Sequence, residues 1–105
     1  MIQNLSQLKK ELKTCPRLEI TGHLRPECVG QIRRVTLVNT RGLYSAVEGQ
    51  PDHKFSRANE GWGAYLEWGK AEAWSFEDGI CAVYERGMAH TREHLIMAFR
   101  VLDAA

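Results

Sequence analysis

Two histidines and a glutamate stand close together in the segment His90-Thr91-Arg92-Glu93-His94, which matches the pattern H-x-x-E-H. On a helix, histidines four residues apart share one face, where they can bind zinc while the glutamate serves as a base. A catalytic zinc takes three protein ligands, and in peptidases of this type the third is a carboxylate far downstream. Only eleven residues follow His94. We therefore expect no metal and no cofactor, and a metal-dependent hydrolase using His90, Glu93 and His94 is the third of three functional hypotheses.

Other catalytic signatures are missing from the sequence. The patterns G-x-x-x-x-G-K-[ST] and G-x-G-x-x-G do not occur, so the usual phosphate cradles of nucleotide and dinucleotide enzymes are lacking. His23 and His53 have no neighbouring cysteine or aspartate at the spacing of a local triad motif. We expect a protein that is not an enzyme.

The three cysteines, Cys15, Cys28 and Cys81, include no C-x-x-C pair, which argues against a disulfide framework or a zinc ribbon. Cys81 lies in an apolar run and is expected to be buried, whereas Cys28 lies in a polar loop and is expected to be the more reactive thiol. No apolar stretch is long enough to cross a bilayer, and lysines interrupt the N-terminal leucines. These features predict a cytoplasmic protein that does not act at a membrane.

Aromatic residues gather between positions 62 and 76, and two of them are expected to have opposite roles. Strand alternation places Trp68 on the same face as Leu66, which indicates a core position. Trp62 lies between two glycines in a long loop, a setting suited to an exposed contact residue. The expected protein-binding surface centres on this loop and consists of Lys54, Arg57, Glu60, Trp62 and Tyr65.

Basic residues suggest a second kind of partner, nucleic acid. Residues 1–57 hold ten Lys and Arg against five Asp and Glu, whereas residues 58–105 hold four against eight. Such asymmetry can mark a surface that faces phosphate, although solvated faces of one domain explain it more simply. The candidate nucleic-acid-binding residues are Arg33, Arg34 and Arg41, with Lys54 and Arg57 from the loop.

One short amphipathic helix is predicted over residues 4–14. Asn4 can cap it, and Leu5, Leu8 and Leu12 recur at helical spacing along one stripe. The helix ends before Pro16, because the residue that precedes a proline is pushed out of the α region. We expect the leucine stripe to pack on a sheet of the same chain.

The remainder of the chain has the texture of short strands separated by turns. Strands are predicted near residues 17–21, 32–39, 43–47, 64–68, 73–76 and 80–84. Asp78-Gly79 is a strong hairpin signal. Another hairpin turn is predicted at residues 39–42, and Gly42 is expected to close it with a positive φ. The run 95–102 fits a strand or a helix, and we favour a closing strand. The prediction is one α+β domain over residues 1–105, with a helix at about 4–14 packed on a small, strongly bent, antiparallel SH3-like β-barrel that covers about 17–102.

Four short segments of the chain stand out together: Gly30-Gln31-Ile32-Arg33-Arg34-Val35-Thr36-Leu37-Val38-Asn39-Thr40, Leu43-Tyr44, Leu66-Glu67-Trp68-Gly69-Lys70-Ala71 and Asp78-Gly79. Taken together they resemble a loose family of short uncharacterised proteins from phages and mobile elements. Members show a V-T-x-V-x-T-x-x-F/Y strand pair followed by a W-P-K-A element. This chain departs from the pattern at Gly69, where proline is usual, and the resemblance covers roughly residues 5–85.

The resemblance implies a phage-type setting, in which small domains without active sites often occlude a host machine. The leading hypothesis is therefore a non-catalytic accessory protein that binds and inhibits a host protein, such as a CRISPR or other defence nuclease, through the loop around Trp62. The second hypothesis is an SH3-like nucleic-acid-binding module.

Overall fold

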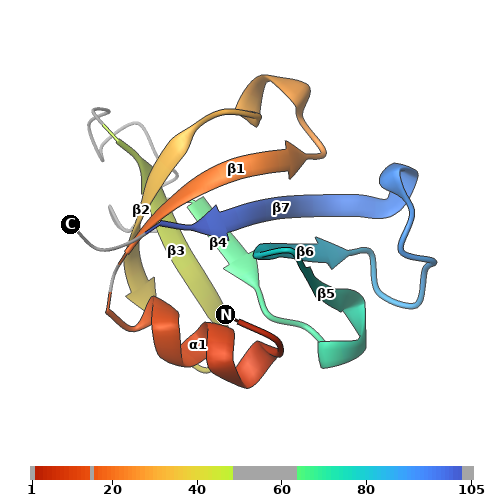
Figure 1. The fold of residues 1–105 in the computed structure, drawn as a ribbon, viewed down its shortest axis with the longest axis horizontal. Coiled ribbons are helices and arrows are strands. Elements are labelled where there is room, and N and C mark those ends of the chain that lie inside the picture. Colours follow the sequence, from red (N-terminus) through yellow and green to blue (C-terminus); the bar gives the residue numbers. More distant parts are fainter. Residues whose placement is uncertain (1, 15, 49–63, 103–105) are drawn as a thin grey trace.

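The structure of the chain, a computed structural model, describes residues 2–14, 16–48 and 64–102 (Figure 1). In these ranges the helix and the strands lie within two residues of the predicted positions. Three single-turn 3-10 helices, η1 (Pro26–Cys28), η4 (Ala71–Ala73) and η5 (Arg92–His94), lie in the connections. The main elements are α1 (Leu5–Leu12), β1 (Arg17–His23), β2 (Ile32–Val38), β3 (Gly42–Val47), β4 (Ala64–Glu67), β5 (Trp74–Glu77), β6 (Ile80–Tyr84) and β7 (Leu95–Val101).

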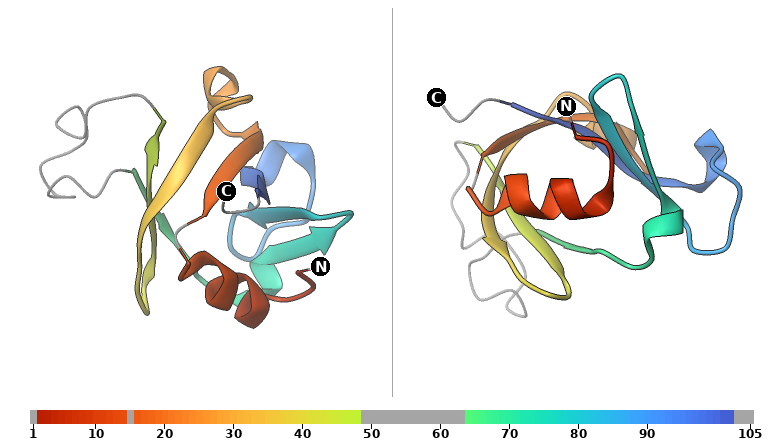
Figure 2. Two further views of the ribbon diagram at one scale, coloured as in Figure 1. Left: turned by 60° about the vertical axis from the view of Figure 1, so that its left-hand side comes forward. Right: turned by 60° about the horizontal axis from the view of Figure 1, so that its bottom comes forward.

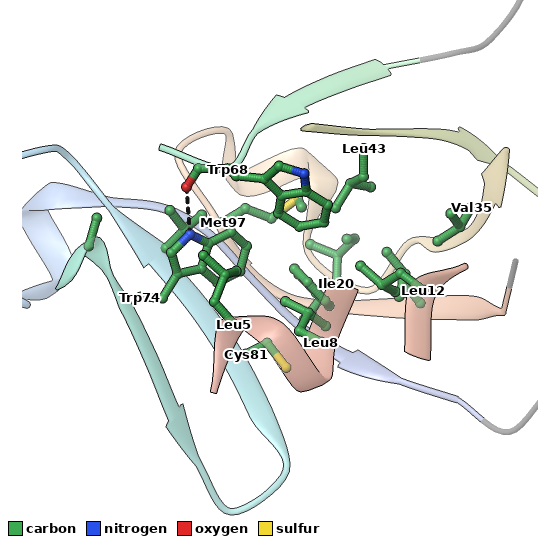
Figure 3. Close-up of a cluster of buried hydrophobic side chains, with 14 residues drawn as sticks. Leu5, Leu8, Leu12, Ile20, Val35, Leu43, Trp68, Trp74, Cys81 and Met97 are labelled. Carbon is green, nitrogen blue, oxygen red and sulfur yellow. Dashed lines mark hydrogen bonds between the residues drawn. The ribbon is translucent and has the colours of Figure 1, made fainter. Parts of the chain in front are cut away.

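Helix α1 begins with the cap that the sequence predicts. The Asn4 side chain accepts the backbone N–H of Gln7 at 2.9 Å, and the Gln7 side chain accepts the N–H of Gln3 at 2.7 Å. These bonds satisfy donors that a helix start otherwise leaves without a partner. The leucine stripe is buried against the sheet, as expected (Figure 3).

The seven strands form one antiparallel sheet in the order β4-β3-β2-β1-β7-β6-β5. The sheet bends strongly, but no described strand pair joins β4 to β5, so it does not close and the predicted barrel is not confirmed. Two tryptophans span this gap, because Trp74 Nε1 donates to the carbonyl of Trp68 at 2.7 Å and their rings lie 6.0 Å apart. Side-chain contacts replace ladder hydrogen bonds there.

Helix α1 lies across one end of the bent sheet, as the right-hand view of Figure 2 shows. Its leucines share a buried cluster with Phe99 and Trp68, and Lys9 Nζ lies 5.3 Å from the centre of the Trp68 ring. Trp68 is 2% exposed, which confirms its predicted place in the core. No helix of the described residues is long and apolar enough to cross a membrane.

The two hairpin turns predicted from the sequence, at residues 39–42 and 78–79, are stabilised in different ways. Asp78 and Gly79 both have positive φ, 53° and 79°, as a tight two-residue hairpin requires, so this prediction is confirmed. The expected positive φ at Gly42 is wrong. Gly42 is a buried residue of β3, and a side chain there would collide with the carbonyl oxygen of Leu66 on β4. Glycine is needed at this position for a close approach of two strands, and the Asn39 side chain holds the turn by accepting the N–H groups of Arg41 and Gly42.

Candidate anion-binding pocket

A pocket of about 370 Å³ is formed by β1, β2, β3, β4, β7 and the connection that carries η1. This connection lies at the top of Figure 1, and α1 lies at the bottom. Three residues that line the pocket, Arg33, Ser45 and Met97, are buried on the face of the sheet that packs the core. The pocket therefore opens at the end of the sheet that the helix does not cover.

Strand alternation turns Arg33 into the interior. Arg33 and Val35 are 8% and 1% exposed, whereas Arg34 between them is exposed. Successive side chains of a strand point to opposite faces, so the position that carries Val35 into the core also carries the Arg33 side chain inward. A guanidinium at a core position is unusual and calls for a physical explanation.

A β-bulge in β1 brings His23 to the same pocket. Ile20 pairs with Phe99, Gly22 with Ala98 and His23 with Met97, so two steps along β1 match one step along β7. The extra residue reverses the alternation, and His23 comes to lie opposite the buried Met97. Bulges of this kind commonly redirect side chains beside binding sites.

The Arg33 guanidinium is held by a neutral partner. Its Nε and Nη2 both donate to Gln31 Oε1, at 3.1 and 2.9 Å, and its Nη1 lies 4.0 Å from Met97 Sδ. An amide oxygen orients the guanidinium but carries no compensating charge. Nη1 lies against a thioether sulfur, which is a weak acceptor.

No carboxylate of the described residues forms an ion pair with Arg33; the ion pairs in these ranges are made by Arg17, Arg100 and His94. Burial lowers the pKa of Arg33, and the nearby Cys28 side chain acts in the opposite direction. The pocket thus contains a buried positive charge that no acid of these ranges balances.

His23 adds a neutral ring to the pocket. Its Nδ1 accepts the backbone N–H of Arg25 at 2.9 Å, so in the neutral ring the proton lies on Nε2. Burial lowers the pKa of His23, the charges of Arg33 and Arg25 lower it further, and Glu27 raises it. The ring is therefore uncharged at neutral pH and offers a donor at Nε2.

The rest of the lining is mostly apolar. Leu66, Ile96 and Met97 form part of the wall, and Leu24 is 60% exposed beside them. Tyr65 is 41% exposed, and its ring lies 4.9 Å from that of Tyr44. A few polar groups set among apolar walls are typical of small-molecule sites.

The predicted protein-binding surface falls mostly outside the described residues. Lys54, Arg57, Glu60 and Trp62 belong to the range 49–63, which the structure does not describe. Tyr65 is described, and it lies at the pocket.

The three candidate nucleic-acid-binding arginines are not on one surface. Arg33 is buried, Arg34 projects from the opposite face of β2, and Arg41 is exposed in the turn before β3. Arg34 lies directly opposite Arg17 on β1, and Arg17 pairs with Glu48 at 3.5 Å. Among these three described arginines, Arg33 therefore does not share the outer face of the sheet with Arg34.

The H-x-x-E-H segment does not form the helix that zinc binding requires. Thr91 is extended, and only the single turn η5 follows it. The His90 ring stacks on Tyr84 at 4.4 Å, with its Nε2 2.9 Å from the carbonyl oxygen of Glu72, whereas His94 lies 3.2 Å from Glu85. Each histidine is engaged with different neighbours.

Sequence reasoning grouped Arg33 with Arg34 and did not identify the pocket. Part of the signal was present, because Arg33 and Val35 alternate with the polar residues Arg34 and Thr36. Comparison with protein-family models, with curated proteins and with solved structures found no match for this chain.

Proposed function

We propose that this chain is a non-catalytic binding module that takes up an anionic group in the pocket around Arg33. The observation that carries the proposal is Arg33 itself, a residue that is 8% exposed and whose guanidinium has no carboxylate partner among the described residues. Taking a charge out of water costs several kcal/mol unless an opposite charge compensates it. Proteins keep a buried charge without a compensating opposite charge chiefly where function requires it. An anionic ligand supplies the missing charge.

This proposal is compatible with the leading hypothesis from the sequence, in which the chain is a phage-type accessory protein that binds a host protein. In that case an anionic group of the partner enters the pocket. The bent sheet capped by a helix supports an SH3-like relationship, with an open gap between β4 and β5. The free thiols Cys28 and Cys81 are in keeping with the reducing cytoplasm.

The test is an NMR titration of the isotope-labelled protein with sodium acetate and inorganic phosphate. At least one anion should shift the Arg33 Nε–H signal and the backbone amides of Arg25 and Cys28 in a saturable manner. Arg33→Met should abolish these shifts, and Arg34→Met, a change at the next residue on the outer face, should leave them intact. The proposal fails if neither anion shifts the pocket signals, or if the shifts persist in Arg33→Met.

A further inference from the structure

The chemistry of the pocket narrows the ligand class, an inference that rests on the proposed function. We infer that the pocket takes a monocarboxylate attached to an apolar body. The carboxylate lies on the free edge of the Arg33 guanidinium, and the apolar body lies against Leu66, Ile96 and Met97, with Leu24 at the rim.

The free edge of Arg33 matches the shape of a carboxylate. Gln31 occupies the Nε–Nη2 edge, so the edge formed by Nη1 and Nη2 retains donors that face no oxygen acceptor of the described residues. Two parallel N–H groups on a planar fork bind the two oxygens of a carboxylate in bidentate fashion. Met97 Sδ, the present neighbour of Nη1, is a weak acceptor, so a carboxylate oxygen competes favourably with it for the Nη1 donors.

A phosphate dianion fits this pocket less well, because phosphate sites usually add several free backbone N–H groups. Here the amides of Leu24, Arg25 and Cys28 already donate to Ile96, His23 and Arg25 respectively. The His23 ring is neutral at neutral pH, and the carboxylate of Glu27 lies close enough to influence it. Arg25 also lines the pocket but is exposed, so Arg33 supplies the one buried positive charge of this lining, and it balances a single negative charge.

The walls select an apolar body. Leu66, Ile96 and Met97 present aliphatic and thioether surface, and a volume of about 370 Å³ is at the lower end for small-molecule sites. A simple anion such as acetate leaves most of this surface wet. A larger acid covers it and gains affinity from the apolar area removed from water.

The experiment measures the affinities of phenylacetate, acetate, phenyl phosphate and the neutral phenylacetamide by the same NMR titration. Phenylacetate should bind at least roughly tenfold more tightly than acetate, since its ring is buried. It should also bind more tightly than phenyl phosphate, and phenylacetamide should not saturate the site. Leu24→Ser should weaken phenylacetate but not acetate, and Val29→Ser, which alters a 49% exposed residue outside the pocket lining, should change neither.

Two peptides distinguish a free acid from the end of a protein chain. A peptide that ends in phenylalanine with a free carboxyl group supplies the same chemistry as phenylacetate, and its amidated form lacks the charge. If the free-carboxyl peptide binds at least as tightly as phenylacetate and the amidated peptide does not, the source is a protein C-terminus. If only phenylacetate binds, the source is a small acid. Either result supports the inferred chemistry.

Three outcomes count against the inference. Equal affinity for acetate and phenylacetate shows that the apolar walls contribute nothing, and tighter binding of phenyl phosphate shows that the site is built for a dianion. In both cases the proposed function survives and the inference is lost. If no anion of the series binds in an Arg33-dependent manner, both are wrong.

Discussion

Replacement of the buried arginine by methionine, Arg33→Met, should make the protein more stable while it removes anion binding. Methionine keeps an unbranched stem among Val35 and Met97 and removes the charge. Arg33 is 8% exposed as a residue, and the desolvation of a buried charge costs several kcal/mol. Its two bonds share one acceptor, Gln31 Oε1, and return about 1.5–3 kcal/mol. The difference predicts a gain of about 1–3 kcal/mol in the free energy of unfolding, within the range seen when buried charges are replaced by apolar residues.

Urea unfolding followed by tryptophan fluorescence measures this change, and thermal unfolding provides a second reading. Each kcal/mol corresponds to a rise of roughly 4–8 °C in Tm for a domain of this size. Arg34→Met is the matched control, because an exposed substitution should stay within about 0.5 kcal/mol of the wild type. If Arg33→Met is instead less stable than the wild type by more than about 1 kcal/mol, Arg33 holds the fold through Gln31 and its buried charge is not reserved for a ligand.

Three further perturbations test the packing and the titration of the core. Trp68→Ala should lower the free energy of unfolding by about 3–5 kcal/mol, because the side chain is 2% exposed and its Nε1 donates to the Asn39 carbonyl at 2.9 Å; near wild-type stability in urea would show that α1 and the sheet repack. Gly42→Ala should cost about 1–3 kcal/mol in the same assay through the collision with the Leu66 carbonyl, and an unchanged midpoint would mean that β4 moves freely. Burial raises the pKa of Cys81 from 9.0 to about 11, so the folded state holds this proton more tightly and stability should fall as the pH rises between these values, by up to about 1.4 kcal/mol per pH unit. Urea titrations across this range should show that component in the wild type and not in Cys81→Ala; identical pH profiles would contradict the buried thiol.

Local signals predicted most of the secondary structure. The Asn4 cap, the leucine stripe and the Asp78-Gly79 turn act within a few residues, so the sequence contains all that they require. The strand at Leu95–Val101 was also predictable, because its apolar residues alternate with period two.

The pocket depends on pairings that no local pattern encodes. His23 meets Met97 only because β1 pairs with β7 and because a bulge shifts the register between Ile20 and Gly22. The residues around His23 contain no sequence signal that predicts either the partner strand or the bulge. The inward position of Arg33 was readable from alternation, but its lack of an acidic partner depends on the strands that surround it.

The gap between β4 and β5 likewise has no sequence signature. Whether a sheet closes depends on the accumulated twist and bend of all its strands. Alternation identifies the strands that line a core but does not say how far the sheet turns around it, which is why the predicted barrel was not confirmed while the strands were found.

The central position of β7 affects how the chain folds while it is synthesised on the ribosome. Strands β1 to β4 form one antiparallel meander and β5 with β6 form a hairpin, and β7 is the only strand that joins the two groups in the described sheet. It is also synthesised after every other strand. Until residues Leu95–Val101 emerge, β1 and β6 each present an unpaired edge, which is a template for pairing with other chains. The β1–β7 and β6–β7 contacts therefore form only after residues Leu95–Val101 have been synthesised, which predicts slow folding and a period in which a chaperone protects the nascent chain.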